Sequence, residues 1–162
     1  MKAIPIDNGG LCLEMEDADD WKLLARMLLD ARDPEFDLAE DLGGQVTDEA
    51  VAGDWREFVV PDLRVSFDDG LERVAKAIHR AHQDSAGGAG LVLIPRDAGA
   101  EWYGALNNAR LALEARHKFG RDSHDRPRPQ VVAGFSSEKR AAFLRERLYC
   151  ALQCALLEHA FE

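Results

Sequence analysis

Residues 97–119, DAGAEWYGALNNARLALEARHKF, predict a long helix with two distinct faces, and this helix decides the fold class. Apolar side chains recur at helical spacing and form one stripe: Trp102, Leu106, Ala109 and Leu113. Polar side chains form a neighbouring stripe: Asn107, Arg110 and Glu114. The polar stripe is either a solvated face or a hydrogen-bonded network against another element. We expect Asp97 to cap this helix and Gly120 to end it.

The N-terminal residues predict a β-hairpin followed by a helix. Asn8-Gly9 favours a tight turn, and Pro5 confines its strand to an edge of the sheet. Asp17 is a helix N-cap residue, and Pro34 ends that helix near Arg32. The expected buried face of this helix comprises Trp21, Leu24, Ala25, Leu28 and Leu29.

Residues 34–46 are acidic and contain glycines, which favours a loop. A short helix could run from Thr47 through residues 55–60, and Pro61 suits the first turn of a new helix. The apolar stripe of that new helix is Leu63, Phe67, Leu71, Val74, Ala75 and Ile78. Gly70 weakens the helix by about 1 kcal/mol and favours a bend or break. Residues 91–94, LVLI, predict a buried strand that is closed by Pro95 and pairs with the hairpin.

The last predicted helix starts at Ser136 or Ser137 and is apolar almost all the way round. Its apolar residues are Leu144, Leu148, Ala151, Leu152, Ala155 and Leu156. Such a helix must be covered on most sides, either by its own core or by a symmetry mate. We therefore expect a core domain over residues 1–120 and a linker plus helix over residues 121–162. The fold class is α+β, mainly helical with four or five helices and a small two- or three-stranded antiparallel sheet.

Charge is distributed unevenly along the chain. Residues 1–60 carry 16 Asp or Glu and 5 Lys or Arg, a formal charge of −11, whereas the whole chain carries −10. An acidic surface repels DNA and RNA, which argues against nucleic-acid binding. A basic partner, or solubility alone, explains the acidic balance.

The sequence predicts a cytoplasmic protein with reduced thiols. It has no run of 18 apolar residues, and residues 1–10 lack the apolar centre of a signal peptide. Cys12, Cys150 and Cys154 are odd in number and lack metal-type spacing, which indicates reduced thiols. Cys150 and Cys154 lie one turn apart on an apolar helix face, so we expect them to pack in the core. Fingerprints for a nucleophilic serine, a phosphate loop or a dinucleotide are missing, and we expect no cofactor.

Three segments resemble an uncharacterised bacterial domain-of-unknown-function family: GGLCLEMEDADDWKLL, WREF…LRVSFDDGLERV and ALNNARLALEARHKFG. The last is the most specific, because its leucine–asparagine and arginine pattern matches at Leu106, Asn107, Arg110, Leu111 and Arg116. The resemblance covers about residues 4–120. Members of this family are often encoded beside the adaptor of the Clp protease, so the resemblance implies a link to protein turnover. It assigns no chemistry.

Two groups of residues are candidates for chemistry. Asn107, Arg110 and Arg116 could bind an anion or a carboxylate, because arginine holds such groups with two parallel hydrogen bonds. If Arg110 is buried instead, it needs a carboxylate in its own chain. The candidate partners are Glu57, Asp68, Asp69 and Glu72.

Histidines form the second group. His79 and His82 lie one turn apart on a predicted helix, and His117 lies near His124, Asp122 and Asp125. Together they could ligate zinc or iron. The spacing lacks the defined third ligand of helix-borne metal motifs, and histidines also suit the negative end of a helix. We therefore expect no metal, with His79, His82 and His117 as the weak candidates.

The sequence as a whole favours a non-catalytic interaction or regulatory protein. We expect it to bind a protein partner, or itself as a homodimer through the C-terminal helix, and to bind neither membrane nor nucleic acid. The alternatives are a metal-dependent hydrolase that uses the histidines and a small-anion-binding protein centred on Arg110.

Overall fold

The structure is a computed structural model that describes the chain apart from residues 8, 45, 120–128 and 161–162 and the side chains of residues 50 and 129. The strands are β1 (Lys2–Pro5), β2 (Gly10–Met15) and β3 (Gly90–Pro95). The helical elements are α1 (Ala18–Ala31), α2 (Leu38–Gly43), α3 (Glu49–Asp54), the π-helical turn η1 (Trp55–Val59), α4 (Val60–Asp84), the 3₁₀ turn η2 (Arg96–Ala98), α5 (Gly99–His117), α6 (Pro129–Ala133) and α7 (Ser137–His159). The expected fold class is confirmed, with four long helices, shorter ones between them and a three-stranded antiparallel sheet.

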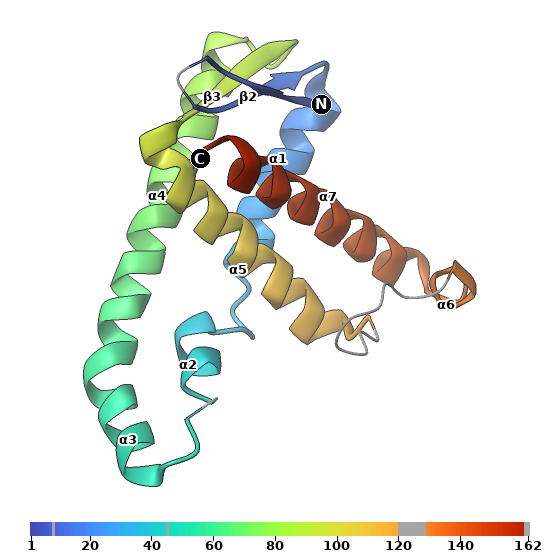
Figure 1. Cartoon of the computed structure of the whole chain (residues 1–162). Coiled ribbons are helices and arrows are strands. Elements are labelled where there is room, and N and C mark those ends of the chain that lie inside the picture. The colour runs from blue at the N-terminus through green and yellow to red at the C-terminus, as the bar shows by residue number, and fades with distance from the viewer. Residues whose placement is uncertain (8, 45, 120–128, 161–162) are drawn as a thin grey trace.

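The sheet lies at one end of the molecule, at the top of Figure 1, and its strand order is β1-β2-β3. The predicted hairpin and its pairing with β3 are confirmed, and Pro5 lies at the end of an edge strand. Asn8 falls outside the described residues. Gly10 adopts a φ of 108°, and a Cβ there would lie 2.3 Å from the Ile94 carbonyl oxygen. Only glycine fits at this close approach between β2 and β3.

Helix α1 begins as predicted but buries a different face. Asp17 caps it by accepting hydrogen bonds from two backbone N–H groups, and the helix ends before Pro34. Trp21 and Leu24 are buried, whereas Ala25 is exposed and Leu29 is 59% exposed, so the expected face is wrong at these two positions. The stripe that α5 covers includes Met27 instead. Helical periodicity fits both stripes, and only the neighbouring helix selects between them.

The middle of the chain is more helical than predicted. The expected loop over residues 34–46 contains α2, which Asp37 caps. The expected short helix exists as α3, but it continues through η1 into α4 without a break. Pro61 lies in the first turn of α4, directly after the wide π-helical turn. Gly70 produces no break, because α4 continues through it to Asp84.

The stripe of α5 that decides the fold is buried as predicted, since Trp102, Leu106, Ala109 and Leu113 are each at most 3% exposed. The predicted N-cap is wrong. Asp97 lies in η2, and the residue that precedes α5 is Ala98, which makes no side-chain cap. The helix ends at His117, and Gly120 lies outside the described residues.

Of the two expected caps of α7, Ser136 and Ser137, the structure selects Ser136, whose hydroxyl accepts a hydrogen bond from the Lys139 backbone N–H. Helix α7 packs along α5 and contributes Tyr149, Leu152 and Leu156 to the same core as α1, α4 and α5. Leu144, 61% exposed, and Ala151 face outward instead, which corrects two of the expected apolar contacts. The expected domain boundary at residue 120 falls among residues that the structure does not describe.

Candidate functional site

The polar stripe of α5 forms a hydrogen-bonded network against α7. The Arg110 Nε donates to Glu146 Oε1 at 3.2 Å, and a second guanidinium nitrogen donates to the Gln153 side chain. Gln153 in turn donates to the Tyr103 carbonyl at 3.2 Å. Glu146 and Gln153 are only 1% and 2% exposed. Of the two readings of the stripe, the network is confirmed.

The partner that the sequence suggested for Arg110 is wrong. All four candidates, Glu57, Asp68, Asp69 and Glu72, lie on or before α4, whereas the actual partner is Glu146 on α7. The distance along the chain explains the error. Helical spacing constrains neighbours within one element and carries no information on a partner 36 residues away.

Arg116 is also held by carboxylates of its own chain. Its guanidinium lies 3.1 Å from Asp33 and 3.3 Å from Glu35. Asn107 is half-buried on the same helix. Both arginines of the expected anion site thus have internal acidic partners that an outside anion would have to displace. Ligand binding at Asn107, Arg110 and Arg116 stays a prediction.

A second buried network, around Asp30, was missed by the sequence analysis. Asp30 accepts hydrogen bonds from Arg145 at 2.7 and 3.2 Å and from the Tyr149 hydroxyl at 2.9 Å. Burial and the neighbouring Asp30 carboxylate raise the pKa of Tyr149. A signal was available, because Asp30 lies in the last turn of α1, where the helix dipole disfavours a negative charge. An acidic residue there indicates a cationic partner.

The structure separates the candidate histidines. His79 and His82 line an apolar groove of about 360 Å³ between α1 and α4, where His82 lies edge-on to Trp21 at 5.2 Å. His117 stacks on Phe119 at the far end of α5, a helix of 19 residues and therefore about 28 Å long. Burial lowers the pKa of His117.

Among the described residues, no three His, Cys, Asp or Glu side chains come close enough to hold a metal ion. The other members of the histidine cluster, His124, Asp122 and Asp125, lie outside those residues. The cysteines need a correction as well. Cys150 is half-buried and Cys154 is exposed, so α7 does not pack both thiols in the core as expected.

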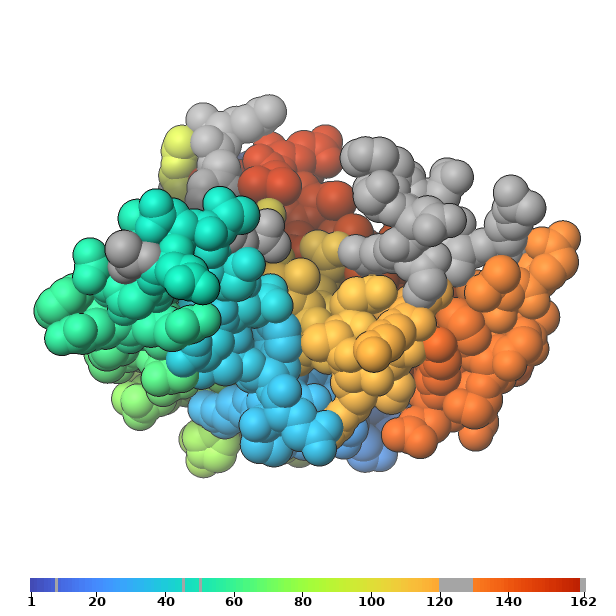
Figure 2. Space-filling view, turned by 90° about the horizontal axis from the view of Figure 1, so that it is seen from below, coloured from blue at the N-terminus to red at the C-terminus, as the bar shows by residue number. Residues whose placement is uncertain are grey.

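One region of the molecule lies away from the buried networks of Arg110 and Asp30. We call residues 37–65 the acidic arm, which comprises α2, α3, η1 and the start of α4. It forms the end of the molecule opposite the sheet in Figure 1, and Figure 2 views the molecule from that end. The arm carries eight Asp or Glu and two Arg, a formal charge of −6. Four large apolar side chains are exposed on it at 42–64%: Leu42, Val51, Phe58 and Val65.

Two contacts fix the shape of the acidic arm. Arg64 on α4 lies 2.7 Å from Asp37 and 2.8 Å from Glu40, which ties α2 to α4. Burial alone would raise the pKa of Asp37, but hydrogen bonds from Arg64 and from backbone N–H groups of α2 outweigh it and lower that pKa. Trp55 packs on Gly43, where an added Cβ would lie 2.7 Å from the Trp55 Cδ1.

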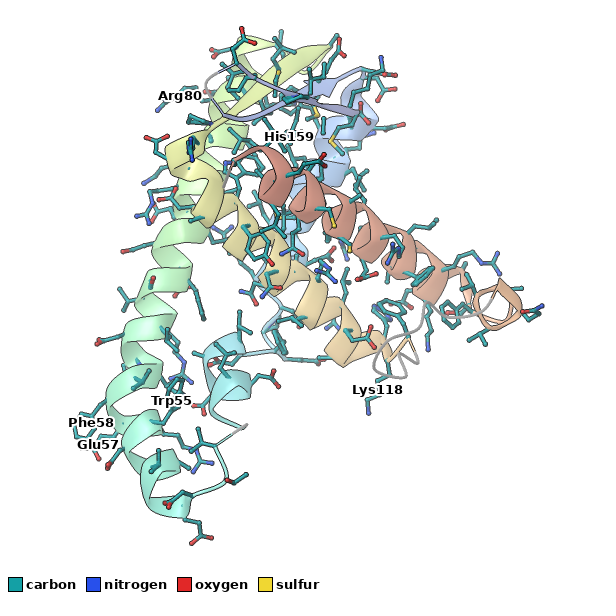
Figure 3. The ribbon with its side chains drawn as sticks, in the orientation of Figure 1. Trp55, Glu57, Phe58, Arg80, Lys118 and His159 are labelled. Atoms are coloured by element: carbon teal, nitrogen blue, oxygen red, sulfur yellow. The ribbon has the colours of Figure 1, made fainter. Side chains whose placement is uncertain are left out.

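The π-helical turn η1 presents side chains to opposite sides. In Figure 3, Trp55 points towards α2, whereas Glu57 and Phe58 lie on the outer side of the arm. Phe58 is 64% exposed. Wide turns of this kind are rare and are frequent at functional sites. Phe58 is thus an exposed aromatic side chain whose neighbours in the sequence include the exposed carboxylates of Asp54, Glu57 and Asp62.

A family model described as a domain of unknown function, DUF2017, matches residues 6–159. The chain belongs to the DUF2017 family. The match extends beyond the residues 4–120 that carried the sequence resemblance and includes α7. No curated protein and no solved structure matches the chain.

In the part of the chain that the structure describes, no helix is both long and apolar enough to cross a membrane.

Proposed function

We propose that this DUF2017 protein is a non-catalytic interaction module that binds a basic, amphipathic segment of another protein on its acidic arm. The observation that carries the proposal is the coincidence of exposed apolar side chains and negative charge at one end of the molecule. Phe58 is 64% exposed and Val65 is 61% exposed, on an arm with a formal charge of −6.

The chemistry of the partner follows from the two kinds of exposed group. Large apolar side chains that are exposed in one region of a protein and flanked by polar residues are suited to bind another protein. Glu49, Glu57 and Asp62 are exposed around Phe58 in the sequence, and they attract lysine and arginine. The complementary segment therefore presents an apolar stripe flanked by basic residues, as amphipathic helices do.

The arm has the rigidity that docking requires. It continues into α4, a helix of 25 residues whose later half is anchored in the core through Leu71, Val74 and Ile78. The contact of Trp55 with Gly43 and the ion pairs of Arg64 hold α2 beside it. A surface that is already ordered loses less conformational entropy on binding than a flexible tail does.

The proposal is tested by capture from a native extract with three baits. These are the wild type, an arm variant (Glu49→Lys, Glu57→Lys, Asp62→Lys) and a control variant with the same charge change outside the arm (Asp69→Lys, Asp84→Lys, Asp97→Lys). We expect a partner that binds the wild type and the control variant but not the arm variant. The purified partner must then bind the wild type directly, and more weakly as salt is added.

Two outcomes contradict the proposal. If both charge variants lose the partner equally, its binding reflects net charge rather than the arm. If neither variant loses it, the binding surface lies elsewhere.

We also propose that this interaction serves protein turnover. The support is the family resemblance and the gene neighbourhood that it implies, beside the adaptor of the Clp protease. In that case the captured partner is a protease component, an adaptor or a degradation substrate. A partner without any relation to proteolysis would remove the link to turnover and leave the docking surface in place.

A further inference from the structure

Strand β3 is an edge of the sheet that carries no charged side chain. Within the residues that the structure describes, β3 pairs with β2 on one side and with no strand on the other, because the strand order is β1-β2-β3. Its six residues are GLVLIP. Leu91 and Leu93 are 56% and 60% exposed. An edge strand presents unpaired N–H and C=O groups, and proteins usually protect such edges with charge, proline or a covering element.

The opposite edge of the same sheet is protected. Strand β1 begins with Lys2, which lies 2.9 Å from Glu16 and 3.9 Å from Glu14, and it ends with Pro5. The charged Lys2 side chain on β1 disfavours the addition of another strand. The terminal prolines do not distinguish the two edges, because β1 ends with Pro5 and β3 ends with Pro95. The two edges of the described sheet therefore differ in charge, and β3 is the one that carries no charged side chain and exposes two leucines.

The register shows that the leucines share the outer face of the sheet. Leu93 faces Cys12 on β2, which in turn faces Ile4 on β1. The alternate residues of β3, Val92 and Ile94, are 1% exposed and point into the core. Because side chains alternate along a strand, Leu91 lies on the same outer face as Leu93.

We propose that β3 pairs with β3 of a second copy of this chain, in antiparallel orientation, and that the two sheets join into one of six strands. Two identical strands related by a twofold axis perpendicular to the sheet are antiparallel by symmetry. Alternation then places Leu91 and Leu93 of both copies as neighbours on the outer face, and Val92 of both copies on the inner face. The contact is self-complementary and leaves no edge of this kind exposed.

Charge favours a second copy at this edge rather than at other surfaces. The chain carries −10, so two copies repel each other when their acidic surfaces meet, above all at the arm. Strand β3 adds no charge to the contact, and Arg96 follows it directly. The apolar edge is thus a place where identical chains approach without repulsion. The sheet and the arm lie at opposite ends of the molecule in Figure 1, so the arm stays accessible in the dimer.

The test is the mass of the full chain in solution, measured by sedimentation over a wide concentration range. We expect the wild type to dimerise, with twice the chain mass of 18.0 kDa. Leu93→Lys should weaken the dimer at least about 100-fold, because it places a charge on the shared face. Leu91→Lys should do the same and serves as a second variant if Leu93→Lys does not fold.

Two control variants separate this edge from other surfaces. Ile4→Lys changes the same row of the sheet on β1, and Leu144→Lys changes the exposed face of α7, through which the sequence predicted a homodimer. Both should remain dimers. Hydrogen exchange adds a readout without any substitution, since the β3 amides should become protected as concentration rises while the β1 amides do not.

A wild type that is monomeric at all concentrations overturns the proposal. So does a dimer that Leu144→Lys dissociates and Leu93→Lys does not, which would assign the contact to α7. The proposal is independent of the docking arm, because Phe58→Asp should leave the dimer intact and Leu93→Lys should leave binding of the basic partner intact.

Discussion

The α5–α7 interface and the acidic arm use the same kinds of side chain in opposite ways. At the interface, Arg110 meets Glu146 and Gln153, and Arg145 meets Asp30, so that charges are paired and nearly hidden from water. On the arm, Phe58 and Val65 are exposed among carboxylates. The α5–α7 interface buries polar side chains, whereas the acidic arm exposes apolar side chains to solvent. The polar stripe of α5 thus contributes contacts that pack α5 against α7, and the exposed side chains of the acidic arm are the basis of the proposed docking surface.

Removing the Asp30 carboxylate is expected to have the largest effect. Asp30→Ala leaves the Arg145 guanidinium and the Tyr149 hydroxyl buried without this partner, which costs about 3–5 kcal/mol of unfolding free energy. At this chain length the melting temperature should fall by roughly 10 °C. Thermal denaturation followed by circular dichroism measures it. A loss below about 1 kcal/mol would show that the buried network contributes little.

A substitution on the exposed surface of the acidic arm should affect partner binding and leave the stability of the fold almost unchanged. Phe58→Asp should weaken binding of the captured partner by about 10- to 100-fold, because an exposed aromatic anchor is replaced by a carboxylate. The unfolding free energy should change by no more than about 0.5 kcal/mol. The control is Leu29→Asp on α1, since Leu29 is 59% exposed and lies outside the arm. Equal binding by both variants would remove Phe58 from the docking surface.

The packing of α2 against α4 is tested by two glycines. Gly43→Ala places a Cβ 2.7 Å from Trp55 and should cost about 1–3 kcal/mol, with loss of amide protection in α2. Gly53→Ala on α3 meets no atom within 4 Å and should be neutral or stabilising by up to about 1 kcal/mol, since alanine favours a helix. If both variants behave alike, Trp55 does not brace the arm.

The smallest expected effect concerns Asp37. Its pKa is lowered in the folded chain, so its contribution is complete above the ordinary value of 3.8 and is lost as the pH falls below that value. Asp37→Ala should cost about 1 kcal/mol at neutral pH, because α2 loses its cap. Asp37→Asn keeps a capping oxygen and should lose less, and its stability should fall less steeply in acid. Acid titrations of the three proteins would refute this if their slopes coincide.

The sequence predicted what depends on local signals. Asp17 was correctly assigned as a cap, and the cap of α7 was narrowed to Ser136 or Ser137, because capping involves groups within three residues. The buried stripe of α5 follows from period and composition alone, and so does the presence of a strand over residues 91–94. The expected burial of that strand is wrong at Leu91 and Leu93, which are 56% and 60% exposed, because one face of β3 packs on the core and the other does not. The sequence also showed that the excess of negative charge lies in residues 1–60, and most of the acidic arm falls within them.

What the sequence missed depends on contacts between distant segments. Glu146 could not be chosen as the partner of Arg110, since nothing local relates α5 to α7. Leu29 and Leu144 fit apolar stripes, yet no helix covers them in the described part of the chain. Pro61 suggested the start of a separate helix, whereas α3 continues through η1 into α4. The sequence could not predict this continuation, because a π-helical turn ahead of a proline has no sequence pattern of its own.

Whether the acidic arm is the docking surface is tested by hydrogen exchange of the wild-type protein with and without its purified partner. We expect the partner to protect amides within residues 37–65 and to leave those of α5 and α7 unchanged. Protection centred on Arg110 and its neighbours in α5, with the arm unaffected, would contradict it.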